Sequence, residues 1–208
     1  TNGGFGNAGK TFSMSNQLTF SGSGELDNGM NVSLSFILDQ GDDTAVSSGP
    51  FDSHSVSVSS DTLGTLKFSG EGGSSATSAL DGTAAGDVWD NFDGTGDITP
   101  TGIGTGNNMF MYTLPTLMDD LSVNISYLPN TTGADTAIGY SATFSGVDGL
   151  SVSYGTGDGT DDATDATALK ASYAYGPVTV AWSNYEYDTT GTSSDNDTTS
   201  YKVTYTVS

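Results

Sequence analysis

Acidic side chains are the most abundant charged groups in this chain, and two segments carry ten of the 25. The first segment spans residues 71–108, is rich in glycine, and carries Glu71, Asp81, Asp87, Asp90, Asp93 and Asp97. The second, Gly155–Thr167, carries Asp158, Asp161, Asp162 and Asp165. Carboxylates gathered in this way attract cations, and their oxygens are the ligands that Ca²⁺ prefers.

Each acidic segment admits two interpretations. The carboxylates of residues 71–108 predict a constriction that attracts cations, as acidic rings do in cation channels, or they belong to a solvated loop without a role in selectivity. The four aspartates of the second segment predict a Ca²⁺ site or a hydrated surface loop. Their spacing lacks the register of an EF-hand loop.

Catalysis by a nucleophile is not expected. His54 is the only histidine in the chain, so a Ser/His/Asp hydrolase would have to use it. In an extended strand, His54 shares its face with Val56 and Val58, which predicts an outward, interfacial histidine near a strand end. We therefore expect a protein that is not an enzyme and has no catalytic residue.

The charge balance excludes one class of partner. The chain has 25 acidic residues against 4 lysines, no arginine, and a formal net charge of −21. Nothing here neutralises a phosphate backbone, so nucleic-acid binding is not expected. Cationic solutes, divalent metals or a saline environment fit this composition better.

An apolar residue at every second position recurs along the chain and predicts the elements that position these groups. The pattern is clear in Met30–Leu38, Leu121–Tyr127 and Tyr201–Val207, where the alternate residues are mostly small and polar. Each strand therefore has one apolar and one polar face. Such strands suit a membrane barrel, apolar outside and watery inside. The alternative is a secreted or surface-layer acidic adhesin module that buries its apolar faces in a sandwich.

Turn residues divide the pattern into five hairpins and an eleventh strand. Short turns are expected at 27–29, 61–64, 115–120, 147–149 and 176–177, with Asn28-Gly29 as a type I′ turn. Longer polar connections are expected at Gln40–Asp52, Asn130–Thr136, Gly155–Thr167 and Asp188–Ser200. Alternation of short turns with long loops is typical of outer-membrane barrels, whose strand number is usually even. Strands are therefore expected beyond one or both ends.

Two further signals concern targeting. No stretch approaches the roughly 18 consecutive apolar residues of a transmembrane helix. No signal peptide is visible, and the chain begins at Thr1, so a processed or incomplete chain is expected.

The succession of hairpins carries a resemblance to a known family. Three segments contribute most: Val56–Phe68, followed by the Gly/Asp-rich connection; Met111–Pro115; and Leu121–Tyr127. In their order and spacing they resemble the trimeric general diffusion porins of Gram-negative outer membranes, particularly the alphaproteobacterial type. The likeness extends over essentially the whole chain.

This resemblance implies a fold and a function. The fold would be a single all-β domain over residues 1–208, an antiparallel transmembrane barrel of 16 strands with about 11 present here. Residues 71–108 would fold inward as the constriction loop. The protein would be a homotrimer in contact with outer-membrane lipid and lipopolysaccharide. It would pass ions and small hydrophilic solutes without a cofactor.

The lysines depart from the pattern of that family, which sets loop carboxylates against a basic cluster on the opposite wall. With no arginine, this chain offers only Lys67, Lys170 and Lys202 at positions that alternation turns inward. They act as selectivity elements or as partners for inward carboxylates. The net field is expected to be negative and to favour cations. A substrate-specific channel or a phage receptor on the same barrel stays an open alternative.

Overall fold

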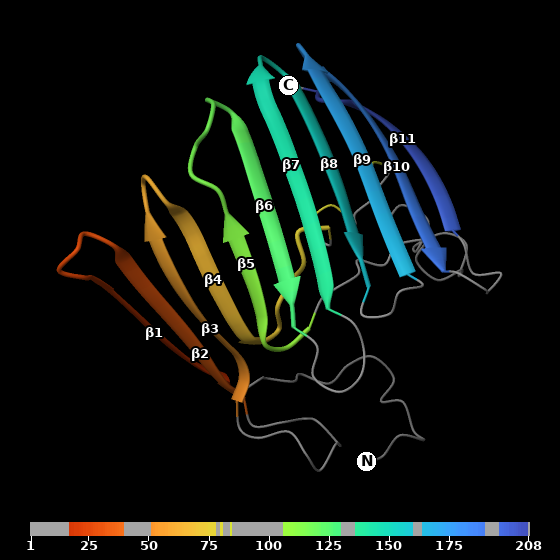
Figure 1. Ribbon diagram of the computed structural model, residues 1–208. Coiled ribbons are helices and arrows are strands. Elements are labelled where there is room, and N and C mark those ends of the chain that lie inside the picture. The colour runs from red at the N-terminus through yellow and green to blue at the C-terminus, as the bar shows by residue number, and fades with distance from the viewer. Residues whose placement is uncertain are drawn as a thin grey trace, which may run out of the picture.

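The computed structural model describes residues 17–39, 51–77, 80, 84, 106–129, 136–159, 164–189 and 196–207. Within these residues, 11 antiparallel strands form one sheet in which every strand pairs with its neighbours in sequence (Figure 1). The strands are β1 (Gln17–Glu25), β2 (Asn31–Asp39), β3 (Phe51–Ser60), β4 (Gly64–Glu71), β5 (Met109–Thr113), β6 (Leu121–Leu128), β7 (Ala137–Val147), β8 (Leu150–Asp158), β9 (Thr164–Tyr175), β10 (Val178–Thr189) and β11 (Asn196–Tyr205). The all-β prediction with eleven strands is confirmed.

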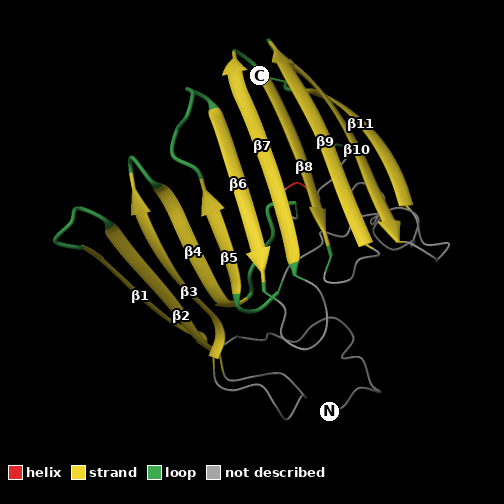
Figure 2. Ribbon diagram, viewed as in Figure 1, coloured by secondary structure: helices red, strands yellow, loops and turns green. Residues whose placement is uncertain are grey.

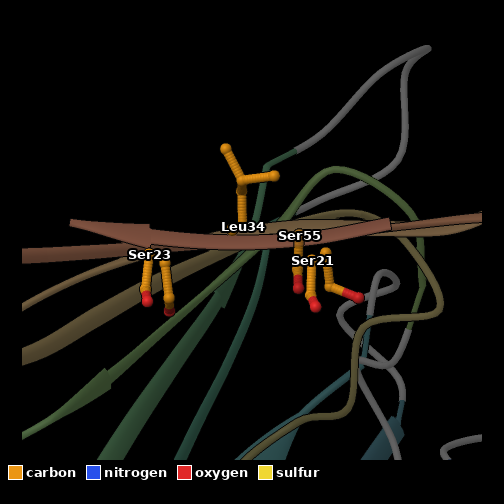
Figure 3. A pocket seen from close by; sticks show the side chains of 7 residues that line it. Ser21, Ser23, Leu34 and Ser55 are labelled. Atoms are coloured by element: carbon orange, nitrogen blue, oxygen red, sulfur yellow. The ribbon is translucent and has the colours of Figure 1, made fainter. Parts of the chain in front are cut away.

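The register of the strands keeps apolar side chains in line. Phe36 pairs with Phe20 on one side, and the rings of Phe68 and Phe110 lie opposite each other with centroids 5.0 Å apart. Figure 3 shows Leu34 pointing to one side of the sheet and Ser21, among other serines, pointing to the other. We call the side of Leu34 the apolar face and the side of Ser21 the polar face.

The apolar face is open to its surroundings in this sheet. Leu18 is 56% exposed and Val203 is 73% exposed, values that no water-soluble core would show for a whole row of residues. The buried apolar side chains of the described residues lie elsewhere, mainly on or against the polar face. No second sheet covers the apolar face among the described residues, so the sandwich predicted by the adhesin alternative does not form there.

The sheet is curved, with edge strands β1 and β11 lying farther from the viewer than β6 and β7 (Figure 1). The short turns of all five hairpins gather at one end of the sheet, and the longer connections leave from the opposite end (Figure 2). No helix within the described residues is long and apolar enough to cross a membrane.

The predicted type I′ turn at Asn28-Gly29 is wrong. Gly29 has a φ of 80°, whereas Asn28 is not among the residues with positive φ. The turn is a three-residue loop, closed by a hydrogen bond from the Leu26 N–H to the Met30 carbonyl at 2.7 Å. Asn28 contributes through its side chain, whose Oδ1 accepts a hydrogen bond from the Met30 N–H at 3.1 Å.

Three of the four long connections are shorter than predicted, because residues at their ends, most of them polar, continue the strands. Much of Gly155–Thr167 belongs to β8 and β9, where the hydroxyls of Thr156 and Thr167 lie 3.3 Å apart across the pair. The predicted connections at Gln40–Asp52 and Asp188–Ser200 also lose their ends to β3, β10 and β11. Strand ends that consist of serine and threonine continue the backbone hydrogen bonding between strands, even though they bury no apolar side chain.

Gly29 tests the turn geometry separately from packing. No atom lies within 4 Å of a Cβ placed on Gly29, so Gly29→Ala introduces only backbone strain at positive φ. We expect a loss of roughly 1–2 kcal/mol in the free energy of unfolding, measured by denaturant titration. Gly24→Ala is the matched control, because its Cβ is also unobstructed and its φ is not positive. Equal stability of both variants would contradict the turn assigned here.

Candidate functional site

The segment that follows β4 is clamped at its two ends. Gly73 and Gly106 form an antiparallel bridge with N···O distances of 3.0 and 3.2 Å. The Gly72 N–H donates to Asn107 Oδ1 at 3.2 Å, and the Asn108 N–H donates to the Gly70 carbonyl at 3.1 Å. The two ends of the connection between β4 and β5 therefore leave the sheet as a hydrogen-bonded pair, which we call the neck.

From this neck, the described residues cross the polar face of the sheet. The Ala76 N–H donates to Ser126 Oγ on β6 at 2.9 Å, and the Ala84 N–H donates to Ser183 Oγ on β10 at 2.9 Å. Ala76 and Thr77 are 0% exposed. In Figure 1 the yellow segment after β4 passes behind β6 and β7. We call the described residues 73–77, 80 and 84 the crossing segment.

The wall beneath the crossing segment is lined by small residues. Gly139 on β7 and Gly155 on β8 lie under it, and Ala166 and Ala168 on β9 are each 1% exposed. Leu80 packs against the cluster of Ala166, Ala168 and Tyr185. The sequence reasoning missed these residues. Their signal was a run of Gly and Ala at polar-face positions of neighbouring strands, where Ser and Thr are usual elsewhere in the sheet.

Few of the predicted acidic site residues are described. Glu71 is half-buried at the end of β4, opposite His54 in the register. The other predicted constriction acids lie outside the described residues: Asp81, Asp87, Asp90, Asp93 and Asp97. The cation-attracting constriction therefore stays a prediction.

The three predicted lysines all occupy polar-face positions. Lys67 lies opposite Ser57 and Met111, Lys170 lies opposite Ser153 and Ser183, and Lys202 lies opposite Ala181. Lys67 and Lys202 are exposed, and Lys170 is half-buried. Since Ser183 accepts the hydrogen bond from Ala84, Lys170 is placed next to the far end of the crossing segment.

Hydroxyl groups line the part of the polar face formed by β1, β2 and β3, away from the crossing segment. Serines of β1, β2 and β3 make up most of the lining of an open hollow of about 450 Å³ (Figure 3), which Gly22 and Leu34 also line: Ser21, Ser23, Ser33, Ser35 and Ser55. Their side chains are small, uncharged and able both to donate and to accept hydrogen bonds. The hydroxyls of this wall can hydrogen-bond to a passing polar solute, but they offer no acid, base or nucleophile pair for a reaction.

The predicted Ca²⁺ site is only partly described. Asp158 and Asp165 face each other across β8 and β9, and Asp161 and Asp162 lie outside the described residues. No group of three or more potential ligands comes together within the described part of the chain. Calcium binding stays a prediction from sequence.

His54 has the surroundings of a packing residue. Its ring stacks on Phe36 with centroids 6.3 Å apart and planes inclined by 10°, and its imidazole occupies the space over Gly70. His54 Nδ1 is buried without a hydrogen-bond partner, whereas the histidine of a hydrolase triad needs a carboxylate at that atom. His54 lies on the apolar face, as the alternation predicts.

The comparisons with known proteins agree with this architecture. A family model described as Gram-negative porin matches residues 1–208. An anion-selective porin from Comamonas acidovorans is 19% identical, with a TM-score of 0.50 over 91% of this chain and 63% of that chain. A variant of Rh. blastica porin is 14% identical, with a TM-score of 0.50 over 90% of this chain and 78% of that chain. At these identities the two structures show a common fold.

The chain spans 63% of the length of the Comamonas structure. No curated protein sequence matches it.

Ser126 tests the attachment of the crossing segment. Ser126→Ala leaves the buried Ala76 N–H without its acceptor, and an unpaired buried donor costs about 1–3 kcal/mol. We expect lower stability and faster proteolysis within residues 71–108, measured by denaturant titration and by limited digestion with mass spectrometry. Ser122→Ala is the matched control, because Ser122 is an exposed serine on the same face of β6. Equal digestion of both variants would show that this hydrogen bond does not hold the segment.

Proposed function

Because this chain belongs to the Gram-negative porin family, we propose that it forms part of the wall of a water-filled pore for passive diffusion. Porins are channels of the Gram-negative outer membrane and not enzymes. The solutes would be ions and small hydrophilic molecules, selected by pore width and charge without a cofactor. One observation carries the proposal: a segment of the chain crosses the polar face while the opposite face stays apolar.

The two faces define the two media that the sheet would separate. In a bilayer, the backbone groups of a spanning sheet must be paired and its outer side chains must be apolar. All neighbouring strands here are paired, and the apolar face carries Leu18, Leu34 and Val180, each at least 38% exposed. Lipid, lipopolysaccharide or a neighbouring subunit would cover this face. Water would fill the side of the serines.

The crossing segment would narrow the water-filled side. It lies on the polar face from Ser126 on β6 to Ser183 on β10, so its thickness is subtracted from the width of the pore. Residues 71–108 would thus form the constriction loop. The remaining wall would come from strands outside this chain, giving a closed barrel of 16 strands and, by analogy with the family, a homotrimer.

Charge favours cations in the proposed pore. The chain has a net charge of −21, and Lys67 is the only lysine among the described residues of β1–β4. A negative lumen concentrates cations and depletes anions. The Comamonas structure is described as an anion-selective porin, but its likeness at 19% identity concerns the fold and not the charges that line this pore.

Planar-bilayer recording tests both the pore and its selectivity. The purified complete porin should conduct in steps, and in a KCl gradient its reversal potential should show cation preference. Lys67→Gln should increase that preference because it removes a positive charge from the polar face, whereas Lys67→Arg should leave it unchanged. Anion preference of the unaltered protein would overturn the charge argument. Absence of conductance would overturn the pore itself.

A further inference from the structure

Three glycines lie on the polar face where the crossing segment passes: Gly139 on β7, and Gly155 and Gly157 on β8. A Cβ at Gly155 would lie 2.7 Å from Leu80 Cδ1. At Gly139 it would lie 2.6 Å from Ser126 Oγ and 3.1 Å from Thr77 Oγ1, and at Gly157 it would lie 2.8 Å from Thr77 Oγ1. The crossing segment thus occupies space that any other residue at these positions would fill.

The glycines belong to a continuous strip of the wall. Gly139 pairs with Ser126 and with Gly157, Gly157 pairs with Ala166, and Gly155 pairs with Ala168. The strip therefore extends from β6 to β9 without a large side chain. Residues directly opposite in a sheet share a face, so these small residues form one shallow recess. We call Gly139, Gly155, Gly157, Ala166 and Ala168 the loop seat.

We propose that the loop seat sets how far the crossing segment stands off the wall, and that it thereby determines the size of solute the pore passes. The inference rests on the proposed diffusion function and adds to it the residues that fix the width of the pore. Glycine inside a strand lowers stability and packs nothing. Its use at three polar-face positions of two adjacent strands is explained by the close approach of the Thr77 and Leu80 side chains of the crossing segment.

The distances indicate how filling the seat would act. Carbon atoms pack at about 3.5–4.0 Å, so a methyl group at Gly155, 2.7 Å from Leu80 Cδ1, displaces Leu80 by roughly 1 Å. A larger side chain displaces it further. The wall is a paired sheet and cannot retreat. A methyl group displaces chiefly the end of the Leu80 side chain, whereas a leucine side chain needs more room than that end can yield and moves the crossing segment toward the water-filled side. That movement narrows the pore.

Gly139 would act through the same segment by a different route. Its added Cβ would displace Ser126 Oγ, which accepts the hydrogen bond from the Ala76 N–H. Gly157 is less suited to a test, because its Cβ would also lie 2.8 Å from the Ile138 carbonyl oxygen of the neighbouring strand. Gly155 is the cleanest position, since its one short contact is to a side-chain end of the crossing segment.

The experiment combines Gly155→Leu with Leu80→Ala in the complete porin. We expect Gly155→Leu to lower single-channel conductance by roughly twofold and to reduce the size of sugar that passes in a liposome-swelling assay. Adding Leu80→Ala to Gly155→Leu should restore both quantities, because it empties the space that the new leucine needs. Gly155→Ala should give a smaller decrease and serves if the leucine variant does not assemble.

Gly24→Leu is the control, since nothing lies within 4 Å of a Cβ at Gly24 and it should leave conductance unchanged. Unaltered conductance and sugar cut-off in assembled Gly155→Leu and Gly155→Ala porins would overturn the loop seat. Failure of Leu80→Ala to restore the pore would also overturn it. Absence of conductance in the unaltered porin would instead refute the proposed function.

Discussion

The rest of the structure depends on a cross-strand register that keeps the large apolar side chains of neighbouring strands on one face from β1 to β11. Many apolar residues lie opposite another apolar residue, as Phe36 does with Phe20 and Val180 with Val203. Because side chains alternate with a period of two, a slip of one residue in any pair would move a whole row to the wrong face. The register therefore decides which side meets lipid and which side meets water.

The crossing segment adds a second requirement to that sheet. Its backbone needs hydrogen-bond acceptors on the polar face, which Ser126 and Ser183 supply, and it needs room, which Gly155 and its neighbours supply. The same face thus contains two kinds of surface. The serine-lined wall of β1–β3 is open to solvent, and the recess of β6–β9 is occupied by the chain itself.

Much of the fold could be predicted from the sequence, because period-two alternation and turn residues are local signals. The alternation in Met30–Leu38 predicted β2. Turns were predicted at Gly149 and Gly176, and both glycines have positive φ in the structure. The turn at Asn28 was wrong in type, since turn geometry depends on how many residues close it. Strand ends at Thr156 were missed because polar residues carry no alternation of hydrophobicity.

The candidate site was harder to predict than the fold. The position of the loop between β4 and β5 was evident from its length and composition, but its seat was not. The role of Gly139 and Ala168 in packing is visible only once the register of neighbouring strands and the position of the crossing segment are known. Contacts between residues about fifty to a hundred positions apart, as from Ala76 to Ser126 and from Ala84 to Ser183, leave no local pattern.

Cysteine scanning along β2 in lipid vesicles shows whether this sheet separates lipid from water. The chain contains no cysteine, so a single substitution at Ser33, Leu34, Ser35 or Phe36 reports on its own position. We expect labelling by a water-soluble thiol reagent at Ser33 and Ser35, and protection at Leu34 and Phe36. Equal labelling at all four positions would contradict this separation.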